Sequence, residues 1–159
     1  IAARIAKVCA AGWPWLVARN EAGVVLGYAY AGQFRERVAY RDTVENAIYI
    51  AHDRLGQVVG KRLLAALIEA CEASAPQGPR QMIAVIAGSE PASIALHAQA
   101  GFVEVGQLKS VGRKHGQWLD VVYMQRAIGP GNTALTRMSG ASSAARIWVR
   151  PRSPHLAAP

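Results

Sequence analysis

One carboxylate stands among apolar residues in the segment TVENAIYI, residues 43–50. This composition predicts a strand, and side chains alternate along a strand, so Thr43, Glu45, Ala47 and Tyr49 share one face. Burying a charge is unfavourable, and a carboxylate in such a place has a raised pKa. A raised pKa suits a general base that works near neutral pH. The alternative is a glutamate exposed at a sheet edge.

A second segment with chemical potential is RLGQVVGKRLL, residues 54–64. A nucleoside triphosphate loop would need G-x-x-x-x-G-K-[ST], but only three residues separate Gly56 from Gly60, and Arg62 replaces the hydroxyl. A dinucleotide loop would need G-x-G-x-x-G, which is absent. The N–H groups and dipole of a helix that begins near Gly60 favour an anion, and Lys61 adds charge. The segment either binds a phosphate group or is a solvated helix start.

The elements that must position these segments follow from hydrophobic periodicity and turn residues. The pattern predicts, in order, a helix at residues 2–11, strands at 14–19, 24–32 and 43–52, a helix at 60–75, a strand at 80–88, a helix at 89–101, and strands at 102–108 and 117–126. The first two strands flank the turn NEAG and are expected to form a hairpin. The short helix at 89–101 is expected to be capped through Ser89 and Pro91.

Composition indicates one globular domain. The chain has 159 residues, of which 52% are hydrophobic and 18% charged, and no apolar run approaches the ~20 residues of a membrane span. Its beginning resembles the middle of an amphipathic helix, as in a chain cut from a longer one. Cys9 and Cys71 lack metal-ligand spacing, so we expect reduced, buried thiols in a cytoplasmic protein and no metal site. We divide the chain into a domain, residues 1–128, and a basic tail, residues 129–159, that is expected to be flexible.

The formal net charge of +8 is divided unevenly. The last 33 residues contain four arginines and no acid, which leaves +4 on residues 1–126. A basic balance can indicate a nucleic-acid partner, but no basic helix with interleaved aromatics is visible. An anionic small molecule accounts for the charge equally well, so we regard a nucleic-acid partner as unlikely and expect no membrane association.

Several long segments resemble the GNAT superfamily of acetyl-CoA-dependent N-acetyltransferases, and within it the phosphinothricin and methionine sulfoximine acetyltransferases. The matching segments are GYAYAGQFRERVAYRDTVENAIYI, VGKRLLAALIEACE, QMIAVIAGSEPASIALHAQAGF and VGRKHGQWLDVVYMQR. They occur in one order between residues 13 and 126. The resemblance implies an α/β (α+β) fold with a mixed, mostly antiparallel sheet flanked by helices. It also implies that the first strand and helices of the family are missing, and that homodimers are common.

The resemblance implies that acetyl-CoA is the co-substrate and assigns residues to it. The backbone of the strand would pair with the pantetheine amides, and the loop with the helix start would hold the pyrophosphate. The residues assigned to acetyl-CoA are Ile48, Ile50, Arg54, Gly56, Val58, Gly60, Lys61, Arg62, Glu90 and Ser93. The family loop reads R/Q-x-x-G-x-G/A, and of its three key positions (Leu55, Val58 and Gly60) only Gly60 matches. Valine resists a positive φ, and Glu90 stands where the family tends to place asparagine.

The resemblance also assigns catalytic and acceptor residues. Glu45 matches the family's proposed base. His97 matches a position from which a tyrosine of many superfamily members is thought to protonate the leaving thiolate, and it is expected to act as a general acid or as a polar group near the thioester. Without the resemblance, His97 would be read as a packed or exposed helix residue. Arg35 and Arg37 are expected to bind a substrate carboxylate through their guanidinium groups, and Lys114 is a further substrate-binding candidate. Asp120 is expected to order its loop by hydrogen bonds.

Two classes of function remain open from the sequence. The first is an N-acetyltransferase that acts on a small amine bearing a carboxylate. The second is a truncated homologue that keeps the fold but binds acetyl-CoA weakly, because Leu55, Val58 and Glu90 depart from the family pattern. A basic nucleic-acid or partner-binding module that uses the arginine-rich tail is a weaker third reading.

Overall fold

The computed structural model describes residues 1–56, 58–74 and 78–129. The predicted tail, apart from Gly129, lies outside the described residues. The elements, in chain order, are α1 (Ala2–Ala10), β1 (Trp15–Arg19), β2 (Val25–Gln33), a 3₁₀ turn η1 (Val38–Tyr40), β3 (Thr43–Ile50), a 3₁₀ turn η2 (His52–Arg54), α2 (Val58–Glu72), β4 (Gln81–Ala87), α3 (Pro91–Gln99), β5 (Val103–Lys114) and β6 (Gln117–Ala127). Every predicted helix and strand is present, with boundaries shifted by a few residues.

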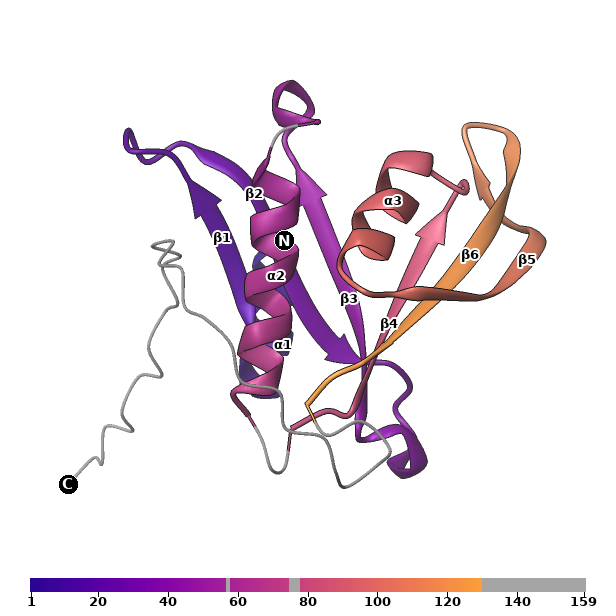
Figure 1. Cartoon of the computed structure of the whole chain (residues 1–159), viewed down its shortest axis with the longest axis horizontal. Helices are drawn as coiled ribbons and strands as arrows, with labels where there is room; N and C mark the ends of the chain where they lie inside the picture. Colours follow the sequence, from indigo (N-terminus) through magenta and orange to yellow (C-terminus); the bar gives the residue numbers. More distant parts are fainter. Residues whose placement is uncertain (57, 75–77, 130–159) are drawn as a thin grey trace.

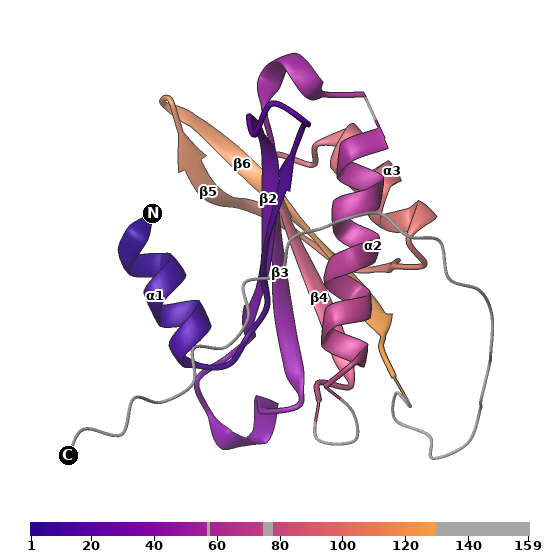
Figure 2. The same cartoon turned by 90° about the vertical axis from the view of Figure 1, so that its left-hand side faces the viewer.

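The strands form one mixed sheet in the order β1-β2-β3-β4-β6-β5. The β3–β4 pair is parallel and the other pairs are antiparallel. Helices α2 and α3 lie on one face of the sheet and α1 on the other (Figures 1 and 2). The predicted α+β architecture is therefore confirmed. Among the described residues, no helix is long and apolar enough to cross a membrane.

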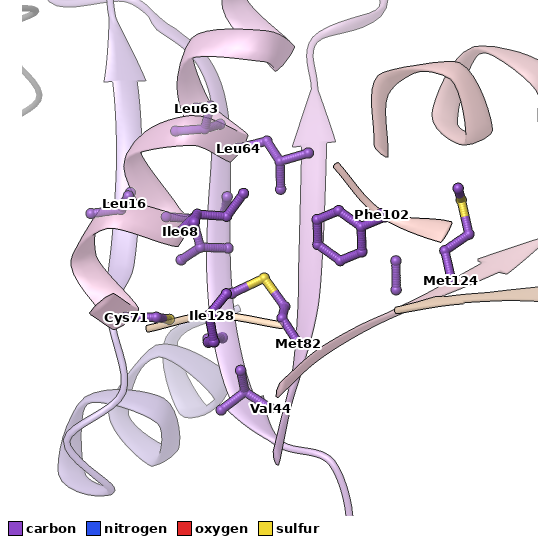
Figure 3. Close-up of a cluster of buried hydrophobic side chains, with 14 of the residues drawn as sticks. Leu16, Val44, Leu63, Leu64, Ile68, Cys71, Met82, Phe102, Met124 and Ile128 are labelled. Carbon is purple, nitrogen blue, oxygen red and sulfur yellow. The ribbon is translucent and has the colours of Figure 1, made fainter. Parts of the chain in front are cut away.

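The core lies between α2 and the sheet, as Figure 3 shows. The apolar positions of α2 recur at helical spacing, so one face of the helix meets the strands. Its fully or nearly fully buried side chains are Leu63, Leu64, Leu67, Ile68 and Cys71. They pack with residues from the sheet such as Leu16, Val44 and Met82. Burial of each large aliphatic side chain contributes about 1.5–3 kcal/mol, so this face holds α2, and thus the start of α2, in place.

The prediction of a loop at residues 109–116 is wrong, because β5 continues to Lys114. The turn consists of only His115 and Gly116, and both have positive φ, 49° and 79°. Two positive-φ residues match the right-handed twist of a hairpin, so a two-residue turn replaces the longer loop. A register shift between Leu108 and Gly112 accommodates the polar residues within the strand.

The prediction for the cysteines is half right. Cys71 is buried, and burial raises the pKa of its thiol to about 12. Cys9 is exposed. The reason is that α1 lies on the open face of the sheet and buries only Val8, so most of its circumference meets solvent.

Candidate active site

The site is organised by two parallel strands that part. The β3–β4 ladder runs from Thr43 and Gln81 to Asn46 and Ala84 and stops there. Beyond that point β2 still pairs with β3 as far as Ile50, and β6 pairs with β4 as far as Ala87. The two strands therefore diverge toward their carboxyl ends, with α3 beside the divergence (Figure 1). β3 precedes α2 in the chain and β4 follows it, and the loss of pairing between these two strands is what a slot for an extended ligand requires.

The backbone of β3 turns its polar groups into this divergence. The N–H of Phe34 donates to the carbonyl of Thr43, and the N–H of Ala51 donates to the carbonyl of Leu26. Hydrogen bonding alternates along an antiparallel strand, so the odd-numbered residues from 43 to 51 face β2 and the even-numbered ones face the β4 side. The amides of Ile48 and Ile50 thus point to the side from which β4 has departed. This geometry agrees with the predicted pairing of Ile48 and Ile50 with a pantetheine arm, which stays a prediction.

Glu45 lies just before the point of divergence. Its neighbours Val44 and Asn46 are buried toward the helices, whereas the alternation of β3 places Glu45 on the α1 face, where it is half-buried. Burial raises the pKa of the Glu45 carboxyl, and the nearby Arg35 guanidinium lowers it to a smaller extent. The predicted rise in pKa is thus confirmed in direction. The carboxyl has the environment of a general base, and that role stays a prediction.

His97 is buried and its ring is fully engaged. Only 2% of His97 is exposed. Its Nδ1 lies 2.7 Å from the carbonyl oxygen of Ser93, which can only accept, so Nδ1 carries the proton. Its Nε2, 3.0 Å from Nδ2 of Asn46, therefore accepts from the amide. Burial lowers the pKa of the imidazole. A neutral ring with both nitrogens bonded to protein groups does not offer a proton to a leaving thiolate, as the predicted general acid would. Ser93, predicted to bind acetyl-CoA, contributes its carbonyl to His97 in this structure.

The loop before α2 differs from the expectation at Val58. The left-handed conformation belongs to Gly56, with φ 72°, whereas Val58 is the first residue of α2 and has no positive φ. Valine is therefore unstrained at this position, which removes one reason to expect weak acetyl-CoA binding. Leu55 and Val58 are exposed, at 57% and 63%. Gly60 is buried, and a Cβ there would lie 3.5 Å from Leu96, an ordinary contact.

Cations gather at the start of α2. Lys61 and Arg62, the fourth and fifth residues of α2, are exposed, and the first turn of the helix contains no acidic residue. Arg54 forms an ion pair with Asp53 at 3.1 Å, which neutralises part of its charge. Two exposed cations beside a helix N-terminus, where the first N–H groups have no acceptor within the helix, form a favourable environment for a phosphate group.

The start of α3 differs from the predicted capping. Glu90 is the N-cap, it makes no side-chain hydrogen bond to the helix, and Pro91 follows it. Ser89 is not the cap: it has φ 49°, and its hydroxyl accepts a hydrogen bond from Gln107. Glu90 is exposed, so its carboxylate is free to contact a ligand that extends along α3.

The three substrate-binding candidates are not brought together. Arg35 and Arg37 lie in the β2–β3 connection, next to the amino end of β3, and Gln33 donates to both of their carbonyl oxygens. Arg35 is close enough to affect the Glu45 carboxyl, and its guanidinium lies over the Phe34 ring. Lys114 lies at the tip of the β5–β6 hairpin, beyond the carboxyl end of β4 and thus at the opposite end of the sheet.

The family model for the acetyltransferase (GNAT) domain matches residues 2–123 of the chain. The chain belongs to the GNAT family. A phosphinothricin N-acetyltransferase of Alcaligenes faecalis is 53% identical over 84% of this chain and 66% of its own length. An L-methionine sulfoximine/L-methionine sulfone acetyltransferase of Pseudomonas paraeruginosa is 44% identical over 77% of this chain and 70% of its own length.

Solved structures extend the family match to three dimensions. The crystal structure of a phosphinothricin acetyltransferase from Sinorhizobium meliloti, in complex with acetyl-CoA, superposes with a TM-score of 0.79 at 47% identity. That match covers 87% of this chain and 73% of the other chain. This chain thus spans 66% to 73% of the length of these three relatives.

Sequence reasoning missed Asn46 as a member of the site. Asn46 is 6% exposed and is the hydrogen-bond partner of His97. The signal was present, because in a strand whose odd-numbered positions include Glu45, Asn46 falls on the opposite, core-facing set. A polar side chain at a core-facing position needs a partner, but its identity depends on a residue 51 positions away.

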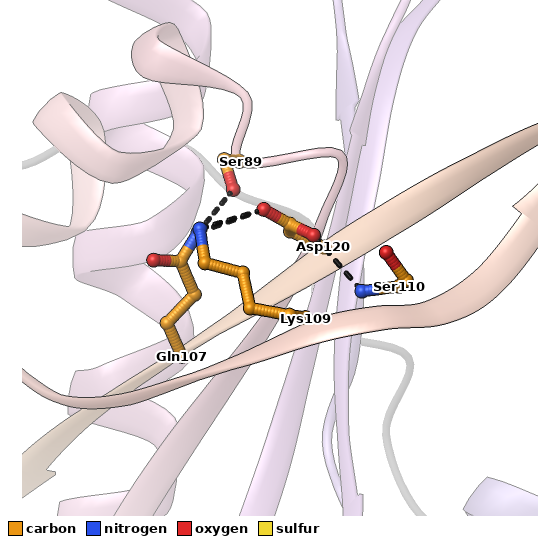
Figure 4. Close-up of polar contacts among 5 residues, drawn as sticks. All are labelled: Ser89, Gln107, Lys109, Ser110 and Asp120. Atoms are coloured by element: carbon orange, nitrogen blue, oxygen red, sulfur yellow. Dashed lines mark hydrogen bonds and ion pairs between the residues drawn. The ribbon is translucent and has the colours of Figure 1, made fainter.

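Asp120 orders the hairpin of this GNAT domain, as predicted (Figure 4). Its carboxylate accepts from Lys109 Nζ at 2.9 Å, from Gln107 Nε2 at 3.2 Å and from the backbone N–H of Ser110 at 2.9 Å. Gln107 also donates to Ser89, so the cluster ties β5 and β6 to the segment that leads into α3. The hydrogen bond from Lys109 lowers the pKa of Asp120 more than any other contact does.

We expect Asp120→Asn to lower the Tm by a few degrees at pH 7, because the amide loses the ion pair with Lys109. A carboxyl with a lowered folded-state pKa stabilises the fold above its unfolded pKa, and that contribution is lost as the pH falls through the folded pKa. The difference in Tm between the two proteins should therefore begin to shrink as the pH falls to about 4, the unfolded pKa of aspartate, and should vanish only below the lowered folded-state pKa. Thermal unfolding across a pH series measures it, and a difference that persists in acid would contradict this account.

Proposed function

We propose that this GNAT domain transfers the acetyl group of acetyl-CoA to the amine of a small amino-acid-like substrate. The observation that carries the proposal is the half-buried Glu45, with its raised carboxyl pKa, beside strands that part with the amides of Ile48 and Ile50 facing the divergence. The relatives named phosphinothricin and methionine sulfoximine acetyltransferases support the choice of an amine acceptor.

The residues divide the task in a definite way. The amides of Ile48 and Ile50 would bind the pantetheine arm, and the first turn of α2, with Lys61 and Arg62, would bind the phosphates. Glu45 takes a proton from the substrate ammonium, and the free amine attacks the thioester carbonyl carbon. A C–N bond forms, the attached nitrogen loses its second proton to solvent, the C–S bond breaks, and the thiolate that leaves takes a proton from solvent.

The acceptor is proposed to be an amino acid analogue that bears a carboxylate. Arg35 and Arg37 lie next to the amino end of β3, the end that also carries Glu45. A guanidinium can donate two parallel hydrogen bonds to a carboxylate. Phosphinothricin, methionine sulfoximine and methionine sulfone, which the relatives' names contain, are the first compounds to test.

Calorimetric titration with acetyl-CoA tests the first requirement, and release of free thiol with each acceptor tests the second. Binding together with acceptor-dependent thiol release would support the enzyme. Absence of binding at millimolar acetyl-CoA would overturn the proposal and leave a GNAT homologue with an impaired cofactor loop, the reading that Leu55 and Glu90 favour.

We propose further that the protein is a cytoplasmic homodimer that pairs through the β5–β6 hairpin. β5 is an edge strand, and large apolar side chains on it are exposed by 45–63%: Val103, Val105, Leu108 and Val111. Exposed apolar edge strands tend to pair with another chain. We expect Val105→Glu to convert a dimer into a monomer in light scattering. A wild-type monomer, or a variant that stays dimeric, would contradict this interface.

A further inference from the structure

His97 is the most deeply buried side chain of helix α3, whose Ile94 and Leu96 are partly buried and also pack against the core. The helix is short, and its N-cap makes no side-chain hydrogen bond. Ile94 and Leu96 hold α3 by apolar packing, whereas His97 links it to β3 by a directional hydrogen bond, so the position of α3 relative to β3 depends in part on what His97 contacts.

The contacts of His97 orient its ring on three sides. Nδ1 donates to the carbonyl of Ser93 one turn earlier, and Nε2 accepts from Asn46. The rings of His97 and Phe102 form a T-shaped pair, with centroids 5.1 Å apart and ring planes at 89°. The Ser93 bond selects the tautomer whose Nε2 is an acceptor, which is the one that the Asn46 amide can serve.

Asn46 is placed at a decisive point of the sheet. It forms the last pair of the β3–β4 ladder, with Ala84, and the next even-numbered residues, Ile48 and Ile50, face the divergence. The hydrogen bond between Asn46 and His97 thus joins α3 to β3 at the vertex where the two strands part. Both side chains are nearly fully buried, at 6% and 2% exposure, so the bond is shielded from water.

We propose that the His97–Asn46 hydrogen bond holds α3 against β3 and so sets the opening that receives acetyl-CoA, and that His97 is a positioning residue and not the proton donor to the thiolate. The part of this inference that concerns acetyl-CoA rests on the proposed function. The geometry supports it, because a proton on Nε2 would face the amide protons of Asn46, and the bond would be lost unless the amide turned over.

Two substitutions of His97 separate positioning from proton transfer. Gln places an acceptor oxygen near the position of Nε2, so His97→Gln should keep the acetyl-CoA Kd within about threefold of wild type. His97→Ala leaves the Asn46 amide unpaired, and loss of a buried partner corresponds to about a tenfold or greater rise in Kd. Asn46→Ala should have a similar effect, and the double variant His97→Ala/Asn46→Ala should be no worse than the weaker-binding single variant.

The inference would be overturned by either of two kinetic results. One is a kcat that falls equally in His97→Gln and His97→Ala while both bind acetyl-CoA as wild type does, since this pattern identifies a proton donor. The other is additive effects of Asn46→Ala and His97→Ala on Kd. His115→Asn, at the exposed hairpin tip, is the matched control and should leave Kd and kcat unchanged.

Amide hydrogen exchange of the free chains keeps this test apart from the proposed function. The inference predicts faster exchange at residues 46–50 and 84–87 in His97→Ala, with restoration in His97→Gln. Unchanged exchange in His97→Ala would overturn the proposed role of the His97–Asn46 hydrogen bond even if the enzyme is active. If wild type fails to bind acetyl-CoA, the proposed function falls, and the exchange pattern still decides whether this bond holds the two strands and α3 together.

Discussion

Glu45→Gln is expected to lower kcat by about 10²–10⁴-fold, the range that a positioned general base contributes. Gln has nearly the same shape as Glu but cannot take the proton of the substrate ammonium. The acetyl-CoA Kd should stay within about twofold, because Glu45 lies on the α1 face and the amides assigned to pantetheine belong to other residues. Steady-state thiol release gives kcat, and calorimetry gives Kd.

The pH dependence of the wild-type enzyme should report the environment of Glu45. Burial raises the pKa of this carboxyl, so kcat/KM should fall as the pH drops through a value above the usual ~4.3 of glutamate. Arg35 opposes the rise. Arg35→Gln should therefore move the acidic limb to higher pH, and this shift can be read from kcat at saturating acceptor even if Arg35 also binds the substrate carboxylate.

Glu45→Gln should also stabilise the fold at neutral pH. A group whose folded-state pKa is raised favours the protonated form in the fold, so its contribution is present below the unfolded pKa and is lost as the pH rises through the folded pKa. At pH 7 the charged carboxylate thus destabilises the native state, and Glu45→Gln should raise the denaturant midpoint while it abolishes most activity. Glu21→Gln, in the exposed β1–β2 turn, should change neither quantity. Full activity in Glu45→Gln would remove Glu45 from the role of base.

Sequence reasoning succeeded where one local pattern decides the structure. The apolar face of α2 and the alternation around Glu45 are each properties of a short segment, and long-range packing only confirmed them. The hairpin failed because KSVGRKHG is polar and glycine-rich, and its strand character depends on pairing with β6 across the His115–Gly116 turn. Pairing of this kind is a property of two segments and is weakly encoded in either one.

The candidate site divides in the same way. The position of Glu45 and the orientation of Ile48 follow from strand periodicity and were within reach of the sequence. The backbone state at Val58 was not, because a shift of two residues along the loop moved the positive φ to Gly56. The state of His97 was also out of reach, since its tautomer depends on Ser93 and Asn46 together. The family resemblance suggested a general acid or a polar group near the thioester, and only the partners indicate a positioning role.

Lys61→Glu/Arg62→Glu is expected to raise the acetyl-CoA Kd by about 100-fold or more at low salt, since each charge-assisted hydrogen bond contributes about 1.5–3 kcal/mol. Both cations are exposed at the fourth and fifth positions of α2, and the first turn of the helix contains no acidic residue that would compete for them. The substitutions place two carboxylates beside the N–H groups at the start of α2, which would otherwise face the phosphates. These N–H groups compensate part of the added negative charge. Calorimetric titration measures the change in Kd.

The dependence on salt distinguishes a direct contact from a general effect of charge. Exposed charges are screened over about 8–10 Å at physiological salt, so the gap in Kd between variant and wild type should narrow as salt is added. Arg41→Glu/Lys7→Glu is the matched control: it makes the same change of net charge, from +8 to +4, at two exposed residues in weak ion pairs away from α2. If the control weakened binding as much as the α2 variant, net charge would account for the effect. If neither variant changed Kd, the phosphates would have to bind elsewhere, and the start of α2 would be a solvated helix end in a domain that holds acetyl-CoA by its strands alone.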